Sequence, residues 1–273
     1  MTTTPTGDAP QLLVDTHVHL FSNTLPLAPG AWTRPHTDLT TEAFLPMMTA
    51  HGVSHAVISA MSLLDDANTY TLTALRSHPH LRATVDVPPG TPFADLAEMK
   101  SSGVVGIRLQ WRRRPHLPDL TTRDYRTLLR QITDLNWHVE LNIESARLPP
   151  VLHALLTAGT KVVVDHFGDP HPETGYNNPG GKALLNALTT AHVWTKLSAG
   201  YRLRVPPTTL ATYATTLLQT AGPTKLFWGS DAPFIGAPHP LTYTDAITSF
   251  KTTVPNPTTR TQITQTSQNF YFT

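Results

Sequence analysis

The sequence predicts an α/β protein that forms a single eight-stranded (β/α)8 barrel. Eight short, apolar and β-branched runs alternate with longer segments of helical periodicity, a pattern typical of a parallel sheet covered by helices on its outer face. Eight such units in 273 residues match the size of a closed barrel. No Gly-x-Gly-x-x-Gly follows the first run, which disfavours an open, doubly wound sheet.

The expected strands are short runs rich in Val, Ile and Leu. In chain order they cover residues 12–17, 54–60, 81–87, 104–110, 137–143, 161–167, 193–199 and 225–231. Because their apolar residues are nearly continuous, these strands are expected to be buried on both faces. One barrel domain is expected over residues 11–273, after a loose Thr- and Pro-rich N-terminal tail at residues 1–10.

The expected helices fill most of the gaps between these strands. They cover residues 41–52, 66–78, 93–103, 122–136, 149–159, 181–192 and 208–222. Glycines stand where several of these helices end, as helix C-caps commonly do, at positions 52, 103, 159 and 222. Two long loops, 22–38 and 111–119, follow the first and fourth strands and therefore fall on the same, carboxyl-terminal side of the barrel.

Composition excludes several classes of partner and chemistry. The net charge is +1, from 20 Lys and Arg against 19 Asp and Glu, so no basic footprint for nucleic acid or an anionic membrane is present. The chain has no cysteine, which excludes disulfides, a thiolate nucleophile and a cysteine-based zinc site. The N-terminal segment lacks the features of a signal peptide, and no apolar run approaches the ~20 residues of a membrane span. We therefore expect a cytoplasmic protein that binds a small molecule.

The first strand ends in the stretch LLVDTHVHLF, residues 12–21. Side chains at positions i and i+2 point the same way from a strand, so His17 and His19 converge on one point. Polar residues at strand carboxyl ends are typical of catalytic sites in this fold. The other polar residues at these ends are Arg108, Gln110, Asn142, Glu144, His166, Tyr201, Arg202 and Asp231. Histidines after strands one and six and an aspartate after strand eight are expected to meet at the barrel axis, which indicates a functional site.

Motifs spread along almost the whole chain resemble the amidohydrolase-related family. They are DTHVHLF (15–21), GIRLQ (106–110), VVDHFGDP (163–170), VWTKLSAGYR (193–202), LFWGSDAPF (226–234) and the closing NFYF (269–272). Within that family the sequence is most similar to the branch of 2-pyrone-4,6-dicarboxylate lactonases and sugar-lactone hydrolases. The resemblance implies a TIM-like barrel of the metal-dependent hydrolase type and a hydrolase activity on a carboxylic ester.

The resemblance also implies roles for individual residues. Asp231 matches the aspartate that activates the attacking water, and Arg108 matches a position that receives a substrate carboxylate. The three histidines, His17, His19 and His166, match the cluster that either holds a metal or polarises the scissile carbonyl.

Lactone hydrolysis requires groups of the same kinds as these residues supply. Hydrolysis of a cyclic ester needs a base for water, hydrogen-bond donors for the developing oxyanion, and a clamp for the rest of the substrate. Asp231 directly follows the last strand and is the candidate base, although Gly-Ser-Asp is also ordinary turn chemistry. An arginine fork such as that of Arg108 binds a carboxylate in a bidentate manner. The remaining expected substrate-binding residues are Gln110, Asn142, Tyr201 and Arg202.

A metal site is a second possibility for the same residues. His17, His19, His166 and Asp231 are sufficient ligands for one zinc or another divalent ion. The lactonase branch works without metal, and strand seven lacks the extra histidine of the zinc-dependent members, so the resemblance implies that no cofactor is needed. Strands four and five offer no bridging lysine for a dinuclear site.

Two departures from the dicarboxylate lactonases bear on the substrate. Asp169 stands where those enzymes carry an arginine after the VDH histidine, and strand five ends in Asn142 and Glu144 where they have a tyrosine. One carboxylate anchor is therefore missing, which favours a monocarboxylate or a neutral sugar lactone as the substrate.

Two alternative functions stay open at this point, together with one unassigned motif. The alternatives are a zinc-dependent decarboxylase or hydratase of the same family and a non-catalytic barrel that only binds a ligand. The cluster Arg112–Arg114 is either a solvated surface loop or a positive lip that attracts an anionic substrate. The sequence predicts no oligomeric state.

Overall fold

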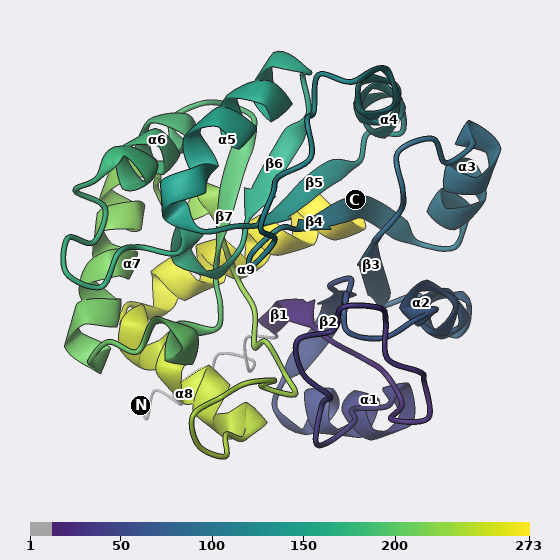
Figure 1. Cartoon of the computed structure of the whole chain (residues 1–273). Helices are drawn as coiled ribbons and strands as arrows, with labels where there is room; N and C mark the ends of the chain where they lie inside the picture. The colour runs from purple at the N-terminus through teal and green to yellow at the C-terminus, as the bar shows by residue number, and fades with distance from the viewer. Residues whose placement is uncertain (1–12) are drawn as a thin grey trace, which may run out of the picture.

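Eight parallel strands follow one another around a barrel in the order of the sequence (Figure 1). The computed structural model describes residues 13–273. The strands are β1 (Leu13–Val18), β2 (Val53–Ile58), β3 (Leu81–Val85), β4 (Val104–Gln110), β5 (His138–Asn142), β6 (Lys161–Val164), β7 (Val193–Leu197) and β8 (Leu226–Trp228). The predicted (β/α)8 fold is thus confirmed. The tail expected at residues 1–10, and the start of the first expected strand at Leu12, lie outside the described residues.

All seven expected helices are present, with bounds within four residues of those expected, and they surround the sheet (Figure 1). They are α1 (Thr41–Ala50), α2 (Ala67–Ser77), α3 (Phe93–Ser101), α4 (Arg123–Asp134), α5 (Leu148–Thr157), α6 (Pro179–Leu188) and α7 (Pro207–Ala221). Two further helices, α8 (Tyr243–Thr253) and α9 (Pro257–Phe272), were not predicted. Short 3-10 turns are η1 (Ser145–Arg147), η2 (His166–Gly168), η3 (Gly200–Leu203) and η4 (Pro223–Lys225).

The sixth and eighth strands end earlier than their apolar runs suggest. β6 stops at Val164, where residues up to 167 were expected in the strand, and β8 stops at Trp228 instead of 231. The cause is local backbone geometry, because the chain turns into η2 after β6 and adopts a left-handed conformation at Asp231. The polar residues beyond these strands therefore sit on turns at the barrel mouth.

The barrel closes between its first and last strands through a short seam. The backbone N–H of His19 donates to the carbonyl of Ala232 at 2.8 Å, and that of Asp231 donates to the carbonyl of His17 at 2.8 Å. A side-chain bond reinforces the seam, since the Thr16 hydroxyl donates to the Trp228 carbonyl at 2.7 Å. The seam consequently fixes Asp231 beside the two histidines of β1.

The opposite end of the barrel is plugged by the C-terminal helix. Tyr271 of α9 is buried in a cluster with Val57, Val163 and Phe227, which come from β2, β6 and β8. This helix is Thr- and Gln-rich, so its intrinsic helix propensity is modest and tertiary packing stabilises it. None of the helices within residues 13–273 combines the length and the apolar character that a bilayer crossing requires.

Candidate active site

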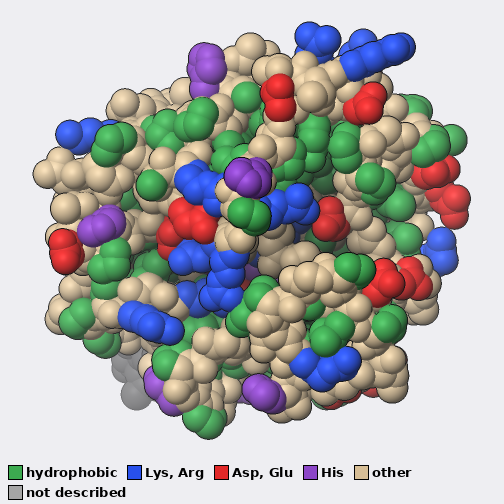
Figure 2. Space-filling model, viewed as in Figure 1, with side chains coloured by type: hydrophobic (Ala, Val, Ile, Leu, Met, Phe, Trp, Pro, Cys, Tyr) green, Lys and Arg blue, Asp and Glu red, His purple; other side chains and the backbone are tan. Residues whose placement is uncertain are grey.

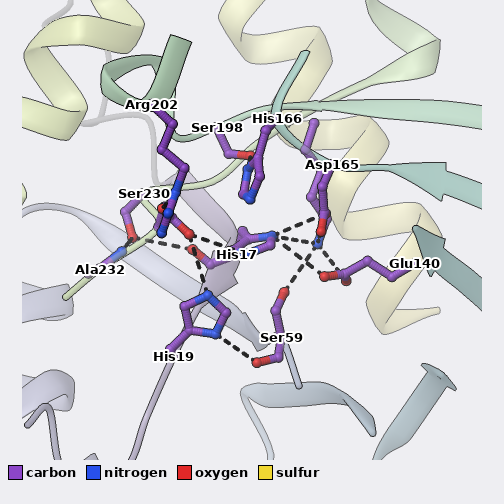
Figure 3. A network of polar contacts seen from close by, with 12 residues as sticks. His17, His19, Ser59, Glu140, Asp165, His166, Ser198, Arg202, Ser230 and Ala232 are labelled. Atoms are coloured by element: carbon purple, nitrogen blue, oxygen red, sulfur yellow. Dashed lines mark hydrogen bonds and ion pairs between the residues drawn. The ribbon is translucent and has the colours of Figure 1, made fainter. Parts of the chain in front are cut away.

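The predicted site residues His17, His19 and His166 meet at the mouth of the barrel (Figure 3). Asp231 joins them beside the ring of His17. The ring centroid of His17 lies 5.0 Å from that of His19 and 4.8 Å from that of His166. Oδ1 of Asp231 lies 3.4 Å from Nε2 of His17 and 3.4 Å from Nε2 of His19. All four residues are buried, so their polar atoms face one another rather than bulk water.

Left-handed backbone positions the two site residues that come after strands. His166 has φ 54° and Asp231 has φ 65°, values that a residue with a side chain rarely adopts. Each such residue costs of order 1–3 kcal/mol, and such conformations cluster at functional sites because the surrounding structure imposes them. The turns carry both side chains back over the barrel axis.

Asp231 uses its two carboxylate oxygens differently. Oδ2 accepts hydrogen bonds from the Tyr201 hydroxyl and from Nε of Arg202, the latter at 2.9 Å. Oδ1 is buried and has no hydrogen-bond partner among the described residues. Burial alone would raise the pKa of Asp231, but the positive charge of Arg202 holds that pKa well below its usual range. Asp231 is therefore ionised at neutral pH, with Oδ1 free to accept a proton.

The proton on His19 is fixed on one side of its ring. Nδ1 lies 2.9 Å from the carbonyl oxygen of Ser59, which can only accept, so Nδ1 carries a hydrogen. In the neutral ring Nε2 then presents a lone pair toward Asp231, and in the cation it donates to Asp231. For His166, Nδ1 lies 2.9 Å from the Ser198 hydroxyl, which can donate or accept. Burial lowers the pKa of His166 to about 3, so this imidazole is neutral.

Sequence reasoning missed three buried charged residues beside His17, namely Glu140, Asp165 and Lys196. Figure 3 shows Glu140 and Asp165 next to the His17 ring. Nδ1 of His17 lies 3.3 Å from Oδ1 of Asp165, 3.6 Å from Oε1 of Glu140 and 3.2 Å from Nζ of Lys196. All three side chains are buried. Burial and the charge of Lys196 keep the pKa of His17 well below its ordinary value, so its ring is neutral.

These buried charges are paired with one another. Lys196 Nζ lies 2.6 Å from Oε2 of Glu140. Burial and the nearby Asp165 raise the pKa of Glu140, with Lys196 and Arg108 opposing the shift. Burial alone would raise the pKa of Asp165 as well, but Arg108, His17 and Lys196 hold it well below its usual range. Because an unpaired buried charge is strongly destabilising, the folded state requires these ion pairs.

Arg108 has internal partners that the sequence did not reveal. It stands opposite Glu140 in the register of β4 and β5, and its Nε lies 2.9 Å from Oε1 of that residue. Its Nη2 donates to Oδ2 of Asp165 at 2.8 Å, and its Nη1 donates to the Ala60 carbonyl at 2.6 Å. Only 2% of Arg108 is exposed. The carboxylates that it binds in this structure are the protein's own, so its role as a substrate anchor stays a prediction.

A narrow cavity of about 60 Å³ opens from the histidine cluster toward solvent. Asn142 lines it, as does Gln110, whose Oε1 accepts the backbone N–H of Ser62. A wider groove of about 690 Å³ adjoins it and shares several lining residues. Tyr201 lines the groove and Arg202 lines both spaces. In this structure the polar groups of these two residues are directed to Asp231, and their contact with substrate also stays a prediction.

The geometry of the site fits a divalent metal ion. A tetrahedral ion with ligands at about 2.1 Å separates its ligand atoms by about 3.4 Å. Oδ1 of Asp231 lies at that distance from Nε2 of both His17 and His19, and it has no other partner among the described residues. A second group of side chains that could hold an ion consists of His17, Asp165 and His166. The residues that could bind a metal are therefore in place.

Weak sequence signals marked the missed residues. Glu140 lies in the run HVELN and Lys196 in VWTKL, where a single charge interrupts an apolar strand. Glu140 is two residues from Asn142, so both point into the barrel. Asp165 directly precedes His166. A charge inside a strand that is buried on both faces requires a partner, and that requirement is the signal that was available.

Comparison with known proteins places the chain in a family. A sequence model described as amidohydrolase matches residues 14–266, and the chain belongs to this family. It is 29% identical over 228 residues to a 4-sulfomuconolactone hydrolase of Hydrogenophaga intermedia, covering 81% of this chain and 75% of that protein. The resemblance noted in the sequence is thus confirmed.

Two solved structures have the same architecture. A probable 2-pyrone-4,6-dicarboxylic acid hydrolase from Acinetobacter baumannii, crystallised with citric acid bound, is 31% identical with a TM-score of 0.89, covering 95% of this chain and 98% of that one. An amidohydrolase from Burkholderia multivorans with bound zinc has a TM-score of 0.75, covering 95% of this chain and 99% of that one. At 17% identity, the latter shows the fold alone.

Proposed function

We propose that this protein is a hydrolase that opens a lactone of a small carboxylated or sugar-derived substrate. The observation that carries the proposal is the position of Asp231 Oδ1. This ionised oxygen is buried without a hydrogen-bond partner among the described residues and lies 3.4 Å from two imidazole nitrogens. A free carboxylate oxygen beside a group of imidazoles is the arrangement that water activation at a carbonyl requires.

Asp231 acts as the general base. Its Oδ1 accepts a proton from a water molecule as the water oxygen forms a bond to the lactone carbonyl carbon. Its Oδ2 is occupied by Tyr201 and Arg202, which hold the carboxylate in one orientation. This division leaves a single oxygen directed at the reacting atoms.

The histidines stabilise the negative charge that develops on the carbonyl oxygen. His166 is neutral, so its ring has one N–H group. Its Nε2 donates to the carbonyl oxygen when Nδ1 accepts the hydrogen bond from the Ser198 hydroxyl. His19 donates from Nε2 in its protonated form, because Nδ1 is engaged by Ser59. The buried site strengthens these interactions, since water does not screen them.

Collapse of the tetrahedral intermediate completes the reaction. The bond between the carbonyl carbon and the ring oxygen breaks, and the ring oxygen takes up the proton that Asp231 had accepted. One water is consumed, and the product is a hydroxy acid whose new carboxyl group ionises at neutral pH. Asp231 returns to its ionised form.

The same residues would hold a divalent ion, and the site is expected to function without one. A metal on His17, His19 and Asp231 would supply Lewis-acid polarisation of the carbonyl. However, the guanidinium of Arg108 lies 3.4 Å from Nε2 of His17, and Arg202 is bonded to Asp231. These cations already offset the buried carboxylates, which supports a reaction driven by the histidines and Asp231.

The experiment that tests the proposal is a hydrolysis assay with purified protein and acid-bearing lactones. Suitable probes are 4-sulfomuconolactone and 2-pyrone-4,6-dicarboxylate, which the names of the relatives suggest. We expect loss of the lactone absorbance with release of one proton for each ring opened. Release of carbon dioxide with the ring intact would instead indicate a decarboxylase. Binding without turnover would indicate a barrel that only binds its ligand.

A further inference from the structure

The arginines that line the cavity at the barrel mouth differ in one respect, namely whether a carboxylate of the protein already binds them. Lys and Arg side chains gather at the centre of this face (Figure 2). The cavity is lined by four arginines, at positions 108, 112, 113 and 202. Arg108 is paired with Asp165, Arg202 with Asp231, and Arg112 with Asp169 at 2.6 Å. Within residues 13–273, Arg113 has no carboxylate oxygen within the 4.0 Å of an ion pair.

Arg113 is held in place by contacts that leave its hydrogen-bond donors free. Its guanidinium carbon lies 4.0 Å from the centre of the Trp32 ring. Its backbone N–H donates to Oε1 of Glu144 at 2.9 Å, and its φ of 69° turns the chain sharply at this point. Stacking on a ring uses the face of a guanidinium, whereas the N–H groups lie in its plane. The fork of Arg113 is therefore oriented and still available to a ligand.

The Trp32 side chain is 45% exposed, yet residues of other loops contact it. It comes from the long loop after β1, and Arg113 comes from the loop after β4. The loop after β8 also reaches it, since a Cβ placed on Gly236 would lie 3.1 Å from Cη2 of Trp32. Three loops at the mouth thus meet at this indole, which orders Arg113 without neutralising it.

We propose that Arg113, presented by Trp32, is the receptor for an acidic substituent of the substrate, a carboxylate or a sulfonate carried on the lactone ring. This inference rests on the proposed lactone hydrolysis and adds the group that selects the substrate. Both acids offer a planar or tetrahedral set of oxygens that a guanidinium fork binds with two parallel hydrogen bonds. The other three cavity arginines have their charge offset by Asp165, Asp169 or Asp231.

The kinetic test compares two arginine variants on two substrates. Arg113→Met removes the fork but keeps the aliphatic stem that packs on Trp32. Arg112→Met is the matched control, because it changes the same residue type in the same loop but removes a guanidinium that Asp169 already binds. The substrates are 2-pyrone-4,6-dicarboxylate and neutral 2-pyrone. We expect Arg113→Met to lower kcat/KM for the acid by about 10- to 100-fold, with the neutral lactone changed less than about twofold.

The Arg112→Met control is expected to keep kcat/KM within about threefold of wild type on both substrates. Its guanidinium is already bound by Asp169, so its removal takes away no group that binds the substrate. Trp32→Leu should lower kcat/KM for the acid several-fold, and Trp32→Phe should restore most of it, since phenylalanine keeps an aromatic face. Equal losses on acidic and neutral substrates in Arg113→Met would overturn the proposal. So would a selective loss in Arg112→Met instead.

A binding measurement separates this proposal from the proposed activity. Citrate, a tricarboxylate, is titrated calorimetrically into wild type, Arg113→Met and Arg112→Met. We expect only Arg113→Met to lose at least about tenfold in affinity. If no lactone is opened but this loss appears, the receptor stands and the hydrolase proposal fails. Unchanged citrate affinity in Arg113→Met, or no binding and no turnover in wild type, overturns the receptor.

Discussion

Nζ of Lys196 lies 2.6 Å from Oε2 of Glu140 in the interior of the barrel, and both side chains are fully buried. The same ammonium lies 3.2 Å from Nδ1 of His17 and 3.3 Å from the Ser59 hydroxyl. Lys196 of β7 and Glu140 of β5 therefore both contact the ring of His17 of β1 from inside the barrel. No single stretch of the sequence contains this relationship.

Breaking this ion pair should destabilise the protein severely. Lys196→Met leaves Glu140 buried without its partner, and we expect a loss of about 3–5 kcal/mol in the free energy of unfolding. The double variant Lys196→Met/Glu140→Leu should recover much of that loss, because it buries no uncompensated charge. Urea denaturation measures both, with Lys225→Met, a lysine outside the barrel interior, as the control. A Lys196→Met protein within about 1 kcal/mol of wild type would show that the pair is dispensable.

Replacing the proposed base should abolish turnover while leaving substrate binding largely intact. Asp231→Asn keeps the shape of the side chain but removes its charge, so we expect kcat to fall by about 10²- to 10⁴-fold with a much smaller change in KM. Steady-state lactone hydrolysis measures this. Asp169→Asn, a carboxylate of the outer groove, is the control and should keep most of its activity. A near-normal kcat in Asp231→Asn would mean that another group activates the water.

Arg108 is expected to affect stability as well as activity. Arg108→Met leaves Asp165 and Glu140 short of a cation, and we expect a loss of about 3–5 kcal/mol in the free energy of unfolding together with low activity. Arg108→Lys should be nearly as damaging, because an ammonium cannot reach two carboxylates and a carbonyl at once. Thermal melts and kinetics measure both effects. Intact stability with a raised KM for acid-bearing lactones would instead support the substrate clamp that the sequence predicted.

Catalysis should survive removal of metal ions. Elemental analysis of active protein, exhaustive chelation and then an activity assay form the test. We expect chelated protein to keep most of its activity, because the histidines and Asp231 together supply donors and a base. Addition of zinc to the chelated protein is the control. Stoichiometric zinc in the active protein, with activity that chelation removes and zinc restores, would assign the reaction to a metal on His17, His19 and Asp231.

Stability should fall in mild acid partly because of His138, at the opposite end of the barrel from the site. Burial lowers the pKa of this histidine to about 3, whereas an unfolded histidine titrates near 6.5. Between these two values the unfolded chain binds a proton that the folded chain does not. The unfolding free energy therefore decreases as pH falls through this window, by at most about 1.4 kcal/mol per pH unit.

The His138→Gln variant should have a shallower dependence of stability on pH than wild type, because glutamine does not titrate. Denaturation at several pH values between 7 and about 4 tests this. His153→Asn, an exposed histidine of α5, is the control and should follow the wild-type curve. Parallel curves for His138→Gln and wild type would show that the buried ring contributes nothing to the acid sensitivity.

Much of the fold and of the site followed from the sequence because both depend on local periodicity. Eight apolar β-branched runs alternate with seven helical segments, and this alternation, together with the chain length, predicts a barrel. The meeting of His17, His19, His166 and Asp231 at one mouth was predicted because residues at the carboxyl ends of parallel strands share one end of the sheet. Helix α9 was missed because its Thr- and Gln-rich sequence has a weak helical signal and its stability comes from packing against the barrel.

Only the tertiary structure decided which charges are paired. The sequence presents Arg108 as a free anchor and the Arg112–Arg114 cluster as one undivided motif. In the fold, Arg108 meets Glu140 and Asp165 from other strands, while Arg113 meets the indole of Trp32. Strand periodicity determines the side of a strand on which a residue lies, but partners across the barrel are set by register and closure, which depend on residues far apart in the chain. The chemistry of the mouth is therefore determined by contacts that no local pattern specifies.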